Sequence, residues 1–184
     1  MRRGGPCRPF APHEYMTLQP SAPIPALTLQ SEQPEDAAKV EALLGRAFGP
    51  GRFTKASERV RELADFAPEL SVCAWDGERL LGSVRMWRVA VGGRPVVFLG
   101  PLAVEQDDRS AGVGAQLVAR ACEEAAAAGE RQVLLVGDEP YFGRLGFSAA
   151  SARDVILPGP VDQRRVLLRA LKAGGDLAGR VTAR

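Results

Sequence analysis

The sequence is poor in the residues that most often hold metals or form disulfides. It contains three cysteines and a single histidine, His13. Cys7, Cys73 and Cys122 are odd in number and far apart, so they form neither a disulfide framework nor a metal-binding spacing. A single histidine excludes a His-rich metal site and argues against a His-based catalytic triad. We therefore expect no metal site, and small buried thiols in a reducing cytoplasm.

The chain also lacks a long apolar run and a strong excess of charge. No stretch approaches the roughly 18 apolar residues of a membrane span. Residues 1–6 include two arginines, but no apolar segment follows, so neither a secretory nor a twin-arginine signal is expected. The 24 Lys and Arg residues against 22 Asp and Glu residues leave a net charge of +2. We therefore expect a cytoplasmic protein without membrane or nucleic-acid partners.

What is present fits one globular domain with a short extension. The 184 residues have an apolar content of 46%, which is enough to bury a core. Residues 1–25 contain six prolines and no regular apolar period, which predicts a flexible Pro-rich lead-in. Met16 lies inside this segment, so the true start could be Met1 or Met16. Residues 26–184 are predicted to form a single domain, and a homodimer is an open alternative to a monomer.

The first half of this domain is predicted to contain two helices and a run of antiparallel strands. A short strand over Ala26–Gln30 precedes a helix that opens near Pro34 and carries apolar residues at a 3.6-residue period. A second helix is expected over Ser57–Phe66, with Ser57 as its N-cap. Turn signals then separate three consecutive strands, predicted over Leu70–Trp75, Leu80–Val91 and Pro95–Val104.

The second half is predicted to alternate helices with strands. Helical periodicity covers residues 112–128, and Gly129 is placed to end that helix. The apolar run Val133–Val136 is typical of a strand buried on both faces, and the strand–helix–strand order makes it parallel to the strand before the helix. One or two helical turns and two strands follow, over Tyr141–Leu145, Val155–Leu157 and Val166–Leu171. Residues 164–172 also have helical propensity, which leaves a helix there as the alternative.

The most informative segment joins a strand to the start of the helix over residues 112–128. Gly112 and Gly114 let a phosphate approach the backbone without a Cβ in the way, and the first turn of a helix offers free N–H groups. Arg109 adds a permanent cation. The segment therefore predicts a phosphate site, with a merely structural tight turn as the alternative.

Three classes of phosphate-binding turn are candidates here. The Gly-x-x-x-x-Gly-Lys-Ser/Thr pattern of a P-loop is absent. A dinucleotide fingerprint requires Gly or Ala where this chain has Leu117. The pattern Arg109-x-x-Gly112-x-Gly114 resembles the Gln/Arg-x-x-Gly-x-Gly/Ala motif of the GNAT superfamily of acyl-CoA-dependent N-acyltransferases.

The resemblance extends to other segments in the same order as in that superfamily. Those that are similar to its YhbS-like branch are Leu99–Val104, Leu135–Phe147 and Leu157–Pro160. The match covers roughly residues 27–179. It implies the GNAT acyl-CoA N-acyltransferase fold, an α/β (α+β) architecture with a mixed central sheet of about seven strands and about four flanking helices.

The resemblance also implies an activity and a binding site. The expected function is acetyl-CoA-dependent N-acetyltransfer, directly to a primary amine of a small molecule or protein, with acetyl-CoA as co-substrate. The alternative is a non-catalytic acyl-CoA-binding module. In this family the pantetheine chain inserts between two splayed parallel strands. The implied coenzyme-binding residues are Leu102, Ala103, Val104, Arg109, Ser110, Ala111, Gly112, Val113, Gly114, Ala115 and Phe142.

The acid–base groups of the family are only partly present. Many members carry a glutamate on the strand where this chain has Gly100-Pro101, which leaves Asp138 or Glu139 as base candidates. The usual acid is the tyrosine of a Tyr-x-Lys/Arg-x-Gly-Phe pattern, whose place is taken here by Phe142. Tyr141 precedes it, and a shift of one residue turns a helical side chain by about 100°. The usual acid is therefore expected to be missing. Tyr141 stays a candidate acid for the case of an irregular turn, and solvent is the alternative proton source.

Other side chains have weaker functional interpretations. Trp75 and Trp87 are expected as partly buried sheet aromatics, with walls of an acceptor pocket as the alternative. Arg164 and Arg165 are expected on a solvated face, where an anionic acceptor or the 3′-phosphate of CoA could use them.

Overall fold

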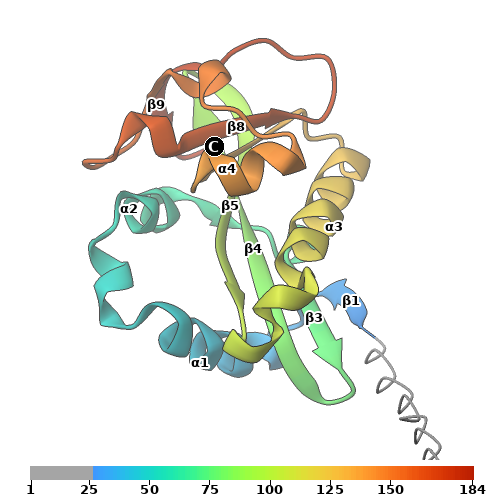
Figure 1. The fold of residues 1–184 in the computed structure, drawn as a ribbon. Helices are drawn as coiled ribbons and strands as arrows, with labels where there is room; N and C mark the ends of the chain where they lie inside the picture. Colours follow the sequence, from blue (N-terminus) through green and yellow to red (C-terminus); the bar gives the residue numbers. More distant parts are fainter. Residues whose placement is uncertain (1–26) are drawn as a thin grey trace, which may run out of the picture.

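A mixed β-sheet forms the centre of the protein (Figure 1). The computed structural model describes residues 27–184, apart from the side chains of Ser110 and Ala111, so the lead-in over residues 1–25 lies outside the described residues. The strands of the described part are β1 (Thr28–Ser31), β2 (Asp65–Phe66), β3 (Val72–Asp76), β4 (Arg79–Val91), β5 (Arg94–Val104), β6 (Gln132–Val136), β7 (Asp154–Ile156), β8 (Val166–Ala170) and β9 (Ala178–Thr182). Six lie in the order β1-β3-β4-β5-β6-β8, while β2 and β9 pair with β4 and β7 pairs with β9.

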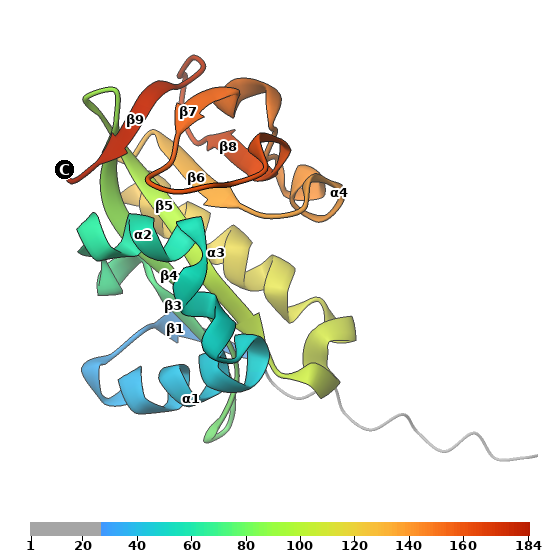
Figure 2. The ribbon, with the colours of Figure 1, turned by 90° about the vertical axis from the view of Figure 1, so that its left-hand side faces the viewer.

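Helices cover both faces of this sheet. Those of the described residues are α1 (Ala37–Phe48), α2 (Ala56–Leu63), α3 (Val113–Ala127) and the single-turn α4 (Glu139–Phe142), besides several 3-10 turns. Helices α1 and α2 lie on one face and α3 on the other, so the sheet is buried between two layers (Figures 1 and 2). None of these helices has both the length and the apolar character needed to cross a bilayer.

The pattern of small and apolar residues in α3 determines which face of the helix is buried. Its buried side chains include the predicted set Leu117, Val118, Ala121, Cys122 and Ala125. They pack on β3, β4 and β5 as one core cluster. Gly129, at φ +87°, follows the end of the helix in a conformation that favours glycine. The predicted helix and its end are confirmed.

The strand pairing also follows the predicted order. Strands β3, β4 and β5 are antiparallel neighbours, and β6 is parallel to β5, as the strand–helix–strand order requires. The segment with alternative helical propensity forms strand β8, which pairs with β6 over its whole length. Tertiary pairing therefore outweighs local propensity in this segment.

Two local predictions are wrong. Helix α2 begins at Ala56 after Lys55 as N-cap, so Ser57 lies inside the first turn instead of capping it. The helix also ends at Leu63, because residues 65–66 form β2 and pair with β4. The ring of Phe66 stacks against Trp87, with 4.9 Å between the ring centroids. This contact between distant segments extends the sheet at the expense of the helix.

Candidate functional site

The start of α3 has the geometry of an anion-binding helix end. Gly112 is its N-cap and has φ +74°, a conformation that a residue with a Cβ adopts only with strain. The first bond within the helix runs from the Gln116 N–H to the Gly112 carbonyl at 3.2 Å. The preceding N–H groups, those of residues 113–115, therefore point out of the helix, where the macrodipole is positive. Arg109 donates from Nε to the Val104 carbonyl at 3.3 Å, which keeps its guanidinium beside this turn.

Strands β5 and β6 part before β5 reaches its end. Their parallel pairing ends at Leu99 and Leu135, after which β6 turns away into α4 while β5 continues to Val104. Within the described residues, no strand pairs with this edge of β5 beyond Leu99. The edge therefore offers backbone N–H and C=O groups to an extended ligand. On its other side, Trp87 donates from Nε1 to the Gly100 carbonyl at 2.7 Å.

A cleft of about 460 Å³ opens where the two strands part. Its floor is formed by β5 and the end of β6. Its walls come from the end of α1 and the α1–α2 connection, from α2, from the segment between β6 and the end of α4, and from the chain leading into β8. The lining residues are Phe48, Arg52, Lys55, Ala56, Ser57, Arg61, Phe98, Leu99, Gly100, Pro101, Leu102, Leu135, Val136, Gly137, Asp138, Phe142, Pro160, Val161, Asp162 and Arg165. Of the expected coenzyme residues, Leu102 and Phe142 are among them.

Phe142 is seated by a glycine and a second aromatic ring. A Cβ added to Gly137 would lie 2.3 Å from Phe142 Cε2 and 2.6 Å from Cδ2, so the ring rests directly on the Gly137 backbone. Phe147 meets it edge to face, with 5.9 Å between the centroids. The ring at the usual acid position is therefore fixed against the cleft floor and carries no hydroxyl.

We expect Gly137→Ala to destabilise the fold by about 1–3 kcal/mol, because the added methyl overlaps the Phe142 ring and forces it to move. Urea unfolding measures the change. Gly143→Ala is the matched control: the φ of Gly143 is −59° and the nearest atom to the added Cβ is 3.9 Å away, so the stability of this variant should be unchanged or slightly higher. Equal stabilities of the two variants would contradict this placement of the ring.

Tyr141 lies on the other side of this turn. A Cβ added to Gly114 would be 2.8 Å from the Tyr141 hydroxyl oxygen, so the hydroxyl lies over the first turn of α3. The side chain is 38% exposed and is not among those that line the cleft. Burial raises the pKa of Tyr141, and the nearby Arg144 opposes that rise. The hydroxyl therefore stays protonated at neutral pH, beside the helix end instead of in the cleft.

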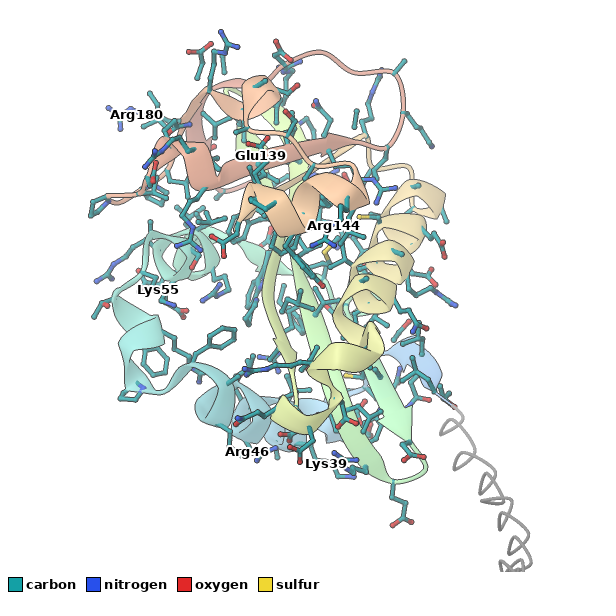
Figure 3. The ribbon with its side chains drawn as sticks, viewed as in Figure 1. Lys39, Arg46, Lys55, Glu139, Arg144 and Arg180 are labelled. Carbon is teal, nitrogen blue, oxygen red and sulfur yellow. The ribbon has the colours of Figure 1, made fainter. Side chains whose placement is uncertain are left out.

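The two predicted base candidates have different surroundings. Asp138 lines the cleft, and its carboxylate forms an ion pair of 3.2 Å with the Arg165 Nε. The side chains of both partners are at least half exposed. Glu139 lies outside the cleft lining, and its Oε1 accepts a hydrogen bond of 2.9 Å from the Ala149 N–H. Figure 3 shows Glu139 on α4. Of the two, only Asp138 thus lines the cleft.

The buried cysteines and the tryptophans are structural. Burial raises the pKa of Cys73 to about 12 and that of Cys122 to about 11, so both remain thiols at neutral pH. Trp75 is buried on the face that α1 covers, and Trp87 packs beneath α2. Neither tryptophan lines the cleft, which favours the interpretation as sheet aromatics. The described residues contain no group of three or more His, Cys, Asp or Glu side chains arranged to hold a metal ion.

Sequence inspection missed the α1–α2 connection as part of the site. Phe48, Arg52 and Lys55 lie around a Gly/Pro segment that reads as a simple helix break, and only the structure brings them to the cleft. Arg61, on α2, was likewise not singled out. The one available signal was the mixture of aromatic and basic side chains in a loop, which is too common to identify a site.

Comparison with known proteins agrees with this geometry. Residues 38–147 match the profile of the Acetyltransferase (GNAT) family. A curated relative from Escherichia coli strain K12, described as an uncharacterized N-acetyltransferase YhbS, is 31% identical over 132 residues, which are 70% of this chain and 78% of that protein.

Solved structures show the same fold. The crystal structure of Escherichia coli YhbS in complex with CoA superposes with a TM-score of 0.71 at 26% identity, covering 89% of this chain and 92% of that one. A GNAT acetyltransferase of Brucella melitensis in complex with acetyl-CoA has a TM-score of 0.65 at 23% identity, covering 88% and 97%. The second comparison supports the fold alone.

Proposed function

The chain belongs to the acetyltransferase (GNAT) family, and we propose that it transfers an acetyl group from acetyl-CoA directly to a primary amine. The observation that carries this proposal is the parting of β5 and β6 at a cleft, together with the glycine-containing start of α3. The two are linked by α4, on which Phe142 lines the cleft and Tyr141 lies over Gly114. One ligand that is extended at one end and carries a diphosphate at the other fits both features.

Free, buried Cys73 and Cys122 are compatible with a cytoplasmic location, which we also propose.

In this proposal the coenzyme lies along the free edge of β5. The pantetheine amides pair with the backbone of Leu102, Ala103 and Val104, in the manner of an added strand. The backbone N–H groups of residues 110–115 bind the diphosphate, where the helix dipole favours negative charge. Arg109 supplies a cation beside them, and the Phe142 ring borders the thioester end.

The transfer itself needs no acyl-enzyme. The amine nitrogen attacks the thioester carbonyl, a C–N bond forms, the C–S bond breaks, the amine releases a proton and the CoA thiolate takes one up. Deprotonating a lysine-like amine at pH 7 requires about 4.6 kcal/mol, whereas an α-amino group of pKa about 8 requires about 1.4 kcal/mol. Asp138 is the proposed proton acceptor, directly or through water.

The proton that the CoA thiolate takes up has no proposed donor among the side chains that line the cleft. Tyr141 is the candidate protein donor, but its hydroxyl lies over Gly114, so solvent is the simpler source. A thiolate of pKa about 8.5 is a good enough leaving group for solvent to serve at a reduced rate. Glu139 is engaged by the Ala149 N–H, and we assign it a structural role.

We expect Phe142→Tyr to raise kcat about tenfold, because it adds a proton donor on a side chain that borders the cleft. Rates are measured as CoA release at saturating acetyl-CoA. Phe53→Tyr is the control, since it adds the same hydroxyl to an exposed ring outside the cleft lining. An unchanged rate in Phe142→Tyr, with an active wild type, would show that proton delivery does not limit the reaction.

The proposed activity is tested by mixing the protein with acetyl-CoA and a panel of amines and detecting free CoA with a thiol reagent. CoA release that depends on an amine supports the proposal. Binding of CoA without turnover of any amine would instead favour the alternative of a non-catalytic acyl-CoA-binding module, for which Phe142 at the acid position is the supporting observation.

A further inference from the structure

We propose that the amine accepted in the cleft carries an anionic group, a carboxylate or a phosphate. This inference rests on the proposed function and names the class of acceptor. Four cationic side chains line the cleft against two carboxylates, Asp138 and Asp162. We call the cationic set the basic wall; it consists of Arg52, Lys55, Arg61 and Arg165.

The basic wall is distinct from the phosphate site proposed for the coenzyme. Helix α2 and the α1–α2 connection cover the face of the sheet opposite to α3, whose first turn receives the diphosphate (Figure 2). Three members of the basic wall, Arg52, Lys55 and Arg61, therefore lie on the face of the sheet away from that turn.

Two members of the basic wall are already neutralised by carboxylates. Arg52 is 16% exposed and pairs with Glu41 at 2.8 Å, while Arg61 is 10% exposed and pairs with Glu58. Their partners hold them in place. Arg52 and Arg61 therefore shape the wall of the cleft and offer hydrogen-bond donors there, but add little net charge to it.

The other two members are available to an incoming anion. Lys55 is exposed, and no carboxylate of the described residues lies within 4.0 Å of its ammonium nitrogen. That nitrogen lies 5.5 Å from the centre of the Phe48 ring. Figure 3 shows it at the start of α2. Arg165 pairs with Asp138 at 3.2 Å in an exposed arrangement, which is weak enough for another anion to compete. Asp162 is engaged by Arg164 at 2.8 Å.

An anionic acceptor also fits the chemistry of the transfer. Lys55, the member of the basic wall without an ion-pair partner among the described residues, disfavours an ammonium ion in the cleft, so it lowers the pKa of a bound amine and reduces the cost of its deprotonation. The anionic group meanwhile supplies the attraction that a neutral amine lacks. One arrangement thus binds the acceptor and compensates in part for the absent strand glutamate.

The test compares amines that differ only in the anionic group. β-Alanine, γ-aminobutyrate and O-phosphoethanolamine are compared with β-alaninamide, γ-aminobutyramide and ethanolamine. Acetyl-CoA binding is measured first by titration calorimetry. Each amine is then titrated into protein saturated with CoA, and CoA release is followed in parallel with acetyl-CoA.

We expect at least one anionic amine to bind and react about tenfold better than its neutral counterpart, with the preference falling as salt is added. Lys55→Gln should remove most of this preference without changing the affinity for CoA. Lys39→Gln should preserve it: Lys39 also lies over an aromatic ring, that of Trp75, but at the far end of the molecule (Figure 3).

The outcomes separate the two proposals. Equal binding and turnover of charged and neutral amines, with CoA bound, would overturn the anionic acceptor and leave the acetyltransferase intact. A preference that survives in Lys55→Gln as fully as in Lys39→Gln would also overturn it. Absence of acetyl-CoA binding would instead refute the proposed function.

Discussion

A glutamate in place of Gly112 should weaken CoA binding at least a hundredfold. Gly112 caps α3, and the added carboxylate would stand where the diphosphate is proposed to meet the free N–H groups. Repulsion between like charges and the added side-chain bulk act in the same direction. Titration calorimetry with CoA measures the dissociation constant.

Gly93→Glu separates this effect from backbone strain. Gly93 lies in the turn between β4 and β5, has φ +79° against +74° at Gly112, and has equally open space around its Cβ position. Its variant should carry similar strain and bind CoA as the wild type does. Equal affinity of the two variants would remove the start of α3 from the binding site.

The second large effect is on stability. Arg85→Leu should lower the free energy of unfolding by about 3–5 kcal/mol, because it leaves the carboxylate of Glu32 buried without its partner. That carboxylate is 4% exposed and accepts hydrogen bonds of 2.7–3.1 Å from the Arg85 guanidinium. Urea unfolding measures the loss.

The same arginine also supports the cleft. It bonds Glu41, which in turn pairs with Arg52 of the basic wall. Burial tends to raise the pKa of Glu41, but hydrogen bonds from Arg52 and Arg85 outweigh it and hold that pKa below 4.5. The stabilisation is therefore present above pH 4.5 and is lost as the pH falls through the lowered value.

Arg79→Leu is the control for the charge change on the same strand. Arg79 is 53% exposed and pairs with Asp108 at the surface, so its loss should alter stability by at most about 1 kcal/mol. A similar loss in both variants would show that the buried pair with Glu32 is not the source of the effect.

Local patterns were sufficient for the main elements of the fold. The spacing of small and apolar residues in α3 fixes both its length and its buried face, and Gly129 marks its end. The strand–helix–strand order then determines that β6 runs parallel to β5. Each of these features depends on residues that are close in the sequence.

Long-range pairing decides the elements that were missed. Strand β9 has no distinctive alternation and forms by pairing with β4 and β7. Strand β2 exists because two residues after α2 reach β4 and Phe66 stacks on Trp87. No neighbouring residue signals either contact.

The candidate site also has one part that depends on neighbouring residues and one that depends on distant residues. The phosphate turn is local, so the motif from Arg109 to Gly114 could be recognised in the sequence. The acceptor half is assembled from the α1–α2 connection, α2 and the chain before β8, whose residues are separated by about a hundred positions. Only the fold brings Lys55 and Arg165 to one cleft.

A crystal structure of the protein with bound CoA tests the proposed site most directly. We predict pantetheine amides paired with residues 102–104 of β5, the diphosphate at the N–H groups that begin α3, and the thiol in the cleft beside Phe142. Coenzyme bound anywhere else, with β5 and β6 parted but empty between them, would contradict the proposed mechanism.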